Sequence, residues 1–139
     1  MALNINGTTG ISGVDGSASA PALQGTDSNT GINFASDTVN INTGGSTRAT
    51  VDSAGRLLLG TTTEGEGGAD DLTISNTSAD MGITLRSGTS NNGQIFFSDG
   101  TSGNAEFAGF IQYAHNGNSC FKSKKEKNFK TSKRFFWTS

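Results

Sequence analysis

Residues 45–62 read GSTRATVDSAGRLLLGTT, and this stretch decides the fold that we expect for the chain. In its first half, Val51 is the apolar member of a short alternating segment. In its second half, Leu57 and Leu59 fall on one face of an extended chain and Leu58 falls on the other. The intervening Ser-Ala-Gly is typical of a tight turn. The stretch therefore predicts two short β-strands joined in a hairpin.

The same spacing recurs along the chain. Apolar residues stand two positions apart in short segments, which gives each segment one apolar edge when it is extended. The pairs are Ile32 and Phe34, Val39 and Ile41, Leu57 and Leu59, Leu72 and Ile74, Ile83 and Leu85, and Ile95 and Phe97. Asn-Gly and Asp-Gly dipeptides supply the positive φ of hairpin turns at residues 6–7, 15–16, 92–93, 99–100 and 116–117. The sequence predicts an all-β chain of short strands rich in Gly, Ser, Thr and Asn.

The apolar content is low for a chain that folds alone. Leu, Ile, Val and Phe make 27 of the 139 residues, close to the level at which chains fail to form a core. Each short strand buries about two side chains, at about 1.5–3 kcal/mol for each side chain. Ordering the chain costs about 1.5 kcal/mol per residue. Identical chains around one axis would share their apolar edges and cover their strand edges, so we expect several copies to associate.

Residues 45–62 resemble a unit that recurs in tail-fibre and adsorption proteins of tailed bacteriophages, particularly those of marine hosts. Segments 1–11, 21–34, 93–100 and 109–118 also resemble this family, so the similarity covers roughly residues 1–121. The resemblance implies an elongated fibre in the form of an intertwined homotrimer, which is made in the host cytoplasm and located in the virion. It implies a role in host adsorption, with other tail, neck or capsid proteins and host cell-surface polysaccharide as partners. The alternative is a connector, anchor or capsid-decoration protein of the virion without direct host contact.

A shared trimer axis would be lined by apolar side chains of the alternating segments. We expect the trimer core to contain Val51, Leu57, Leu59, Ile95 and Phe97. Arg48 and Arg56 would then lie outside, or would contact Asp52 where chains meet.

Changes in composition divide the chain into four regions. Residues 1–63 and 72–121 hold two sets of predicted strands, and the acidic, Gly-rich residues 64–71 are expected to form a flexible linker between them. Residues 122–139 carry a net charge of +6, whereas residues 1–121 carry −8.

The basic and aromatic residues after position 121 form a candidate partner-binding tail: Lys122, Lys124, Lys125, Lys130, Phe135, Phe136 and Trp137. Such a tail suits an acidic surface such as DNA, an anionic membrane or an acidic virion protein. A frameshift at this point of the gene would also produce a tail that lacks glycine and alternation. Nucleic acid is not expected as a partner.

The residue types that catalysis requires are few. His115 is the only histidine and precedes an Asn-Gly turn, and Cys120 has no evident orienting partner. The carboxylates of residues 64–71 stand in a Gly-rich segment that is not expected to hold an acid pair at a fixed separation. Asp27 begins a segment that lacks the further ligands of a calcium loop. We therefore expect no enzyme, no cofactor and no metal site.

Two further expectations concern the cellular context. The sequence contains no apolar run long enough to cross a bilayer, so membrane insertion is not expected. The single Cys120 excludes an internal disulfide, which suits assembly in a reducing cytoplasm.

Overall fold

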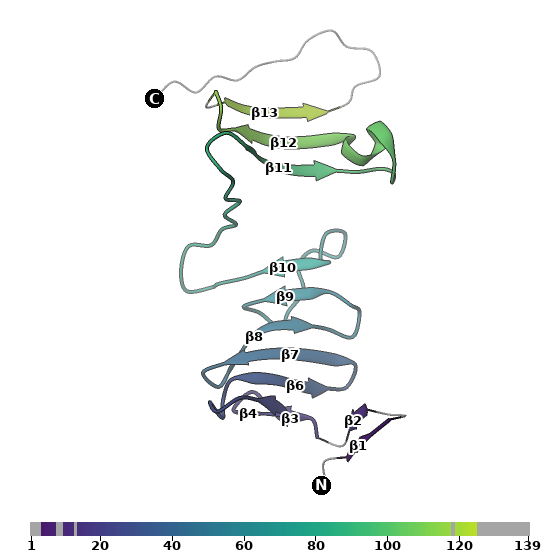
Figure 1. Cartoon of the computed structure of the whole chain (residues 1–139), viewed down its shortest axis with the longest axis vertical. Helices are drawn as coiled ribbons and strands as arrows, with labels where there is room; N and C mark the ends of the chain where they lie inside the picture. Colours follow the sequence, from purple (N-terminus) through teal and green to yellow (C-terminus); the bar gives the residue numbers. More distant parts are fainter. Residues whose placement is uncertain (1–3, 8–9, 13, 118, 125–139) are drawn as a thin grey trace. The chain divides into compact units, whose positions relative to one another are not determined.

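The structure is a computed structural model, and it describes residues 4–7, 10–12, 14–117 and 119–124. These residues form thirteen β-strands and one short 3-10 helix, and they include no α-helix, so the predicted all-β class is confirmed. The chain divides into two compact units, Met1–Met81 and Gly82–Ser139. Figure 1 shows the elements of both units.

The first unit contains two hairpins and one larger sheet. The hairpins pair β1 (Asn4–Asn6) with β2 (Gly10–Ser12) and β3 (Gly16–Ser17) with β4 (Ala20–Pro21). The sheet has six strands in the order β10-β9-β8-β7-β6-β5 (Figure 1). Its strands are β5 (Leu23–Gln24), β6 (Gly31–Ala35), β7 (Thr38–Thr43), β8 (Ser46–Val51), β9 (Leu57–Leu59) and β10 (Leu72–Ile74). Neighbours are antiparallel except for β10, which runs parallel to β9.

The hairpin predicted for residues 45–62 is confirmed as β8 and β9. Its turn is organised by Asp52, whose backbone carbonyl accepts the Gly55 N–H at 2.9 Å. The Asp52 carboxylate accepts the N–H groups of Ala54 and Arg56, each at 3.0 Å. A short acidic side chain that bonds to backbone amides just ahead of it is a common way to fix a turn.

One face of the sheet carries the apolar member of each strand. The strand pairing aligns Val39, Val51, Leu57 and Leu72 in one row across β7 to β10. A second row aligns Ile32, Ile41, Ala49, Leu59 and Ile74 across β6 to β10. Residues two apart in a strand share a face, so both rows lie on the same side of the sheet.

The opposite face, which we call the inner face, is mostly polar and is buried. Asn42 and Leu58 are both only 1% exposed, and Asn33 and Thr50 are also buried. Thr47 Oγ1 donates to Asn42 Oδ1 at 2.9 Å, and Asn42 Nδ2 donates to Asn33 Oδ1 at 2.7 Å. These bonds satisfy amide groups that would otherwise be costly to bury.

The second unit is a three-stranded antiparallel sheet with the order β11-β12-β13. Its strands are β11 (Asn92–Phe97), β12 (Gly109–Ala114) and β13 (Ser119–Lys124), and the 3-10 helix η1 (Gly103–Phe107) connects β11 to β12. On one face Phe96 contacts Phe107 of η1 and Phe110 of β12, with ring centroids 6.2 and 6.3 Å apart. The other face presents Ile95 and Phe97.

The division between the units differs from the sequence-based boundary. Residues 64–71 were expected to separate two strand regions, 1–63 and 72–121. Instead β10 follows this segment and pairs with β9, so residues up to Met81 belong to the first unit. The alternating pattern of Leu72 and Ile74 marks a strand correctly but does not indicate which sheet the strand joins.

Gly60 allows the close approach of β9 and the segment that follows β10. It has a φ of 73°, and a Cβ at this position would clash with the carbonyl oxygen of Ser75. Gly44, in the turn between β7 and β8, has a φ of 59° but open space around it. The two glycines therefore share a left-handed backbone conformation but differ in steric surroundings.

We predict that Gly60→Ala destabilises the protein more than Gly44→Ala does. Each alanine incurs about 1–2 kcal/mol for a left-handed backbone, and only the one at position 60 must also displace Ser75 from β9. Urea unfolding at one fixed protomer concentration measures the difference. Equal losses for the two variants would contradict the close approach.

Candidate assembly surface

The apolar side of the first sheet is the most unusual surface of the described residues. We call it the apolar face, and its members are Leu23, Ile32, Phe34, Val39, Ile41, Ala49, Val51, Leu57, Leu59, Leu72 and Ile74. Within one chain Ile41 is 50% exposed, Val51 44% and Leu57 39%. Scattered apolar residues are normal on protein surfaces, whereas contiguous apolar patches mark interaction sites.

The two faces of this sheet reverse the usual arrangement. Antiparallel sheets commonly bury their apolar face and expose their polar face. Here Asn33, Asn42 and Thr50 are buried, while in the single chain six of the eleven members of the apolar face are exposed and the other five are half-buried. Leu58 is the fully buried apolar side chain among the described residues. The first unit therefore leaves most of its potential hydrophobic stabilisation unused until another surface covers the apolar face.

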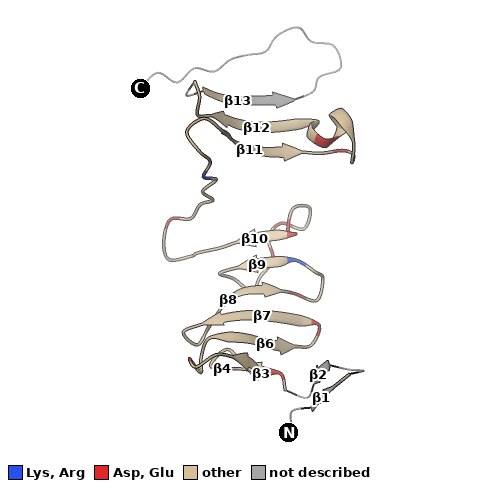
Figure 2. Cartoon of the chain, in the orientation of Figure 1, with Lys and Arg blue, Asp and Glu red and all other residues tan. Residues whose placement is uncertain are grey.

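Carboxylates avoid the strands of the first sheet. Figure 2 shows acidic residues of the first unit in turns and connections, not in the strands of its sheet. Asp37 lies between β6 and β7, Asp52 lies between β8 and β9, and Glu64 and Asp70 lie between β9 and β10. A contact made through this face would consequently bury no carboxylate from the strands, which removes a major cost of association.

The sequence-predicted core residues fall on two sheets. Val51, Leu57 and Leu59 share the apolar face, and Leu58 points to the inner face as the pattern predicted. Ile95 and Phe97 share one face of the second sheet, where Ile111 pairs with Ile95 and Tyr113 follows two residues later. That these side chains surround a trimer axis stays a prediction. Within each unit, the structure places the predicted residues on a common exposed face.

Other members of the apolar face were not selected from the sequence as core residues. Val39 and Ile41 stand on β7, and Leu72 and Ile74 stand on β10. Their spacing by two was visible in the sequence, but which strands adjoin β8 and β9 was not. The pairing of Val39 with Val51, and of Leu72 with Leu57, identifies them as neighbours on one surface.

The candidate partner-binding tail lies largely beyond the part of the chain that the structure describes. Lys122 and Lys124 belong to β13, and only the backbone of these two residues is described. The remaining predicted tail residues lie outside the described residues: Lys125, Lys130, Phe135, Phe136 and Trp137.

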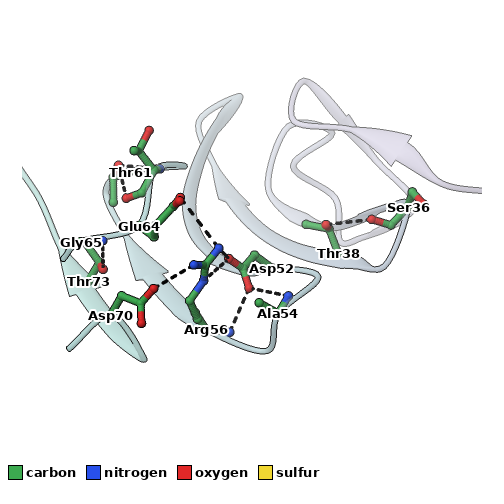
Figure 3. A network of polar contacts seen from close by, with 11 residues as sticks. Ser36, Thr38, Asp52, Ala54, Arg56, Thr61, Glu64, Gly65, Asp70 and Thr73 are labelled. Carbon is green, nitrogen blue, oxygen red and sulfur yellow. Dashed lines mark hydrogen bonds and ion pairs between the residues drawn. The ribbon is translucent and has the colours of Figure 1, made fainter. Parts of the chain in front are cut away.

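A cluster of charged side chains joins the β8–β9 turn and the connection between β9 and β10 (Figure 3). We call Asp52, Arg56, Glu64 and Asp70 the Arg56 cluster. The Arg56 guanidinium donates to Asp52 Oδ2 through Nε at 2.7 Å and to Asp70 Oδ2 through Nη1 at 2.9 Å. Its Nη2 lies 3.8 Å from Glu64 Oε2. One cation therefore joins the β8–β9 turn to the connection between β9 and β10.

This geometry corrects two expectations for charged residues. Arg56 contacts Asp52 of its own chain, so this pair is not needed to join neighbouring chains. Residues 64–71 are not a free linker throughout, because Arg56 contacts Glu64 and Asp70 and the Gly65 N–H donates to Thr73 Oγ1 at 3.0 Å. Arg48, in contrast, is exposed and donates through Nε to Thr43 Oγ1 at 2.9 Å.

The contacts within the Arg56 cluster stabilise the ionised forms of Asp52 and Arg56. The hydrogen bond from the Arg56 side chain is the main cause that lowers the pKa of the Asp52 carboxyl, and the bond from the Arg56 backbone N–H lowers it further. The bonds to Asp52 and Asp70 raise the pKa of Arg56 further above its ordinary value. Charged hydrogen bonds of this kind are stronger than neutral ones and hold the guanidinium in one orientation. The arrangement is suited to holding the connection between β9 and β10 in a fixed position.

Other candidate sites have local structural roles. Asp27 accepts the Asn29 N–H at 3.3 Å and the Thr30 hydroxyl at 2.8 Å, which makes it a turn-forming residue. The His115 ring meets the Tyr113 ring edge-on with centroids 4.7 Å apart. Across the described ranges, no three His, Cys, Asp or Glu side chains gather as metal ligands would. Within the same ranges, no helix has the length and apolar character needed to cross a membrane.

Comparison with known proteins gives no match to a protein-family model, a curated protein or a solved structure.

We predict that the Asp52–Arg56 contact stabilises the chain above about pH 4 and ceases to do so in acid. A carboxylate with a lowered folded-state pKa contributes stability above its unfolded pKa, and this contribution is lost as the pH falls through its folded pKa. Melting temperatures of wild type and Asp52→Asn should therefore differ at neutral pH and converge below pH 4. Parallel melting curves over the whole range would contradict the assignment.

Proposed function

We propose that this chain is a structural subunit of a bacteriophage virion, in a tail fibre or fibre-like appendage that mediates or supports host adsorption. The observation that carries the proposal is the arrangement of the first sheet, which exposes apolar side chains on one face and buries polar side chains on the other. A surface of this kind suits a subunit that reaches its stable form in an assembly. The resemblance of residues 45–62 to repeated units of phage fibres supports the choice of appendage.

Copies of the same chain are the proposed cover of the apolar face. The single chain buries so little apolar surface that a cover over the apolar face should supply much of the stability of the folded protein. A second copy meets this condition without a separate partner, because every chain brings the same face. Repetition of one surface around a rotation axis also produces a closed assembly. We propose three copies, the number that the fibre resemblance implies.

A trimeric appendage would act through multivalency. Three identical weak contacts with a repeated polysaccharide on the host surface reinforce one another when they are held on one stiff body. The chain then needs no catalytic group, and its task is to present contact surfaces at fixed positions. This role places the chain among binding and structural proteins, not among enzymes.

The location of the protein on the particle tests the functional proposal. Purified virions labelled with gold-conjugated antibodies against this chain should carry label on a projecting appendage, and the free protein should compete with virions for host cells. Label confined to the neck or capsid, with no competition, would instead support the connector or decoration alternative. Absence of the chain from purified virions would refute both.

We predict that Leu57→Asp prevents assembly at concentrations where the wild type is trimeric. Leu57 is 39% exposed in the single chain, so an aspartate costs an isolated chain little. In an assembly through the apolar face it buries an unpaired charge in every copy, at about 3–5 kcal/mol each. Light scattering combined with circular dichroism gives the oligomeric state and the strand content.

Ser53→Asp is the matched control, since it adds the same charge at an exposed position of the β8–β9 turn. It should assemble as the wild type does. A wild-type chain that remains a folded monomer at micromolar concentration would refute the proposed assembly. An intact Leu57→Asp trimer would show that the apolar face is not the contact surface.

A further inference from the structure

Strand β10 has little apolar contact of its own to hold it on the sheet. It comprises only Leu72–Ile74, and Leu72 is 51% exposed in the single chain. The preceding connection, residues 60–71, contains four glycines and no helix or strand. Ordering such a segment carries a large entropic cost, about 1–2 kcal/mol for the backbone of each residue. Contacts other than apolar burial must therefore offset this cost.

Polar contacts attach β10 at its beginning and at its end. At the beginning, the Leu57 N–H donates to the Asp71 carbonyl at 2.8 Å, and Arg56 donates to Asp70 at 2.9 Å. At the end, the Ser75 N–H donates to the Leu59 carbonyl at 2.9 Å. The contact between Arg56 and Asp70 is distinctive because the same guanidinium is already fixed by Asp52 in the preceding turn.

Attachment of β10 changes both faces of the sheet. Leu72 pairs with Leu57 and Ile74 pairs with Leu59, so β10 extends both rows of the apolar face. Thr73 pairs with Leu58 on the inner face, and the Gly65 N–H bonds to the Thr73 hydroxyl there. Detachment would shorten the apolar face and uncover the buried Leu58 together with the edge of β9.

We propose that β10 is a detachable edge strand, that Arg56 is the positioning residue that holds it on β9, and that copies of the chain assemble only when β10 is attached. The last part rests on the assembly proposed above. Arg56 itself is no member of the apolar face, so its influence on assembly is indirect. The partner chain recognises an apolar face of full width, which exists only in the attached state, and assembly shifts the population towards that state.

Arg56→Gln and Asp70→Asn test the proposal in the full-length chain. Both remove the Arg56–Asp70 ion pair, and Asp70→Asn leaves the Asp52 turn intact, so it remains informative if Arg56→Gln fails to fold. Arg48→Gln is the matched control for hydrogen exchange at β10, because Arg48 bonds to Thr43 and not to the Arg56 cluster. Hydrogen exchange followed by mass spectrometry reports β10 and the strands β6 and β7 separately. Light scattering over a dilution series reports assembly.

We expect the Leu57 and Ser75 amides to exchange at least about tenfold faster in both variants, with β6 and β7 within about twofold of wild type. The protomer concentration at half-assembly should rise at least about tenfold in both variants. Arg48→Gln should leave exchange at β10 at the wild-type rate. Unchanged exchange at Ser75 would show that Arg56 does not hold β10. Equally faster exchange in all strands would show that Arg56 supports the whole sheet and not a detachable strand.

Two outcomes separate this inference from the proposed function. Fast exchange at β10 with unchanged assembly would refute the requirement for an attached β10 while leaving the trimer intact. A monomeric wild type would refute the assembly itself, and the exchange of Ser75 relative to β6 and β7 would still decide whether Arg56 holds β10.

Discussion

Asn42 lies almost fully buried between Asn33 and Thr47, accepting a hydrogen bond from Thr47 and donating one to Asn33. Each bond contributes only about 0.5–1.5 kcal/mol net, whereas a buried amide left without its partners costs about 1–3 kcal/mol. A slip of one residue in the pairing of β6, β7 and β8 would move these side chains to the opposite face. The amide and hydroxyl bonds therefore select one register, but they stabilise the sheet only modestly.

The apolar face follows from this choice of inner face. Side chains alternate along a strand, so a sheet that directs Asn33, Asn42 and Thr50 inward directs its Val, Ile and Leu residues outward. On β9 and β10 the inner face carries Leu58 and Thr73 in place of amide side chains. The connection 60–71 contacts this part of the face, where the Gly65 N–H bonds to the Thr73 hydroxyl. In the single chain this sheet therefore lacks much of the hydrophobic contribution that a sheet of this size normally draws from its own core.

Much of the first sheet could be predicted from the sequence because its information is local. Spacing by two identified the strands around Ile32, Val39 and Leu57, and the Ser-Ala-Gly turn identified the hairpin of β8 and β9. The opposite facing of Leu58 followed from alternation alone. The predicted hairpin and the all-β class depend on no contact between distant residues, which explains their success.

The features that were missed depend on the path of the chain. The parallel pairing of β10 with β9 is set by how residues 60–71 return, and no spacing rule gives that path. The bond between Arg56 and Asp70 joins residues on either side of this connection, in a segment whose composition is typical of a free linker. Buried Asn and Thr side chains were also missed, because the same residues more often lie on exposed surfaces.

The second unit presents the same unmet need for cover in a different form. Phe97 pairs with Gly109 and Tyr113 pairs with Gly93, so each ring stands directly opposite a residue without a side chain. Ile95 and Ile111 pair between them and are also exposed. Cross-strand side-chain pairs are a main source of sheet stability, and glycine forgoes that contribution. Two sheets with unrelated strand orders thus both leave apolar side chains exposed in the single chain, so the cover that we propose for the first unit would stabilise the second unit for the same physical reason.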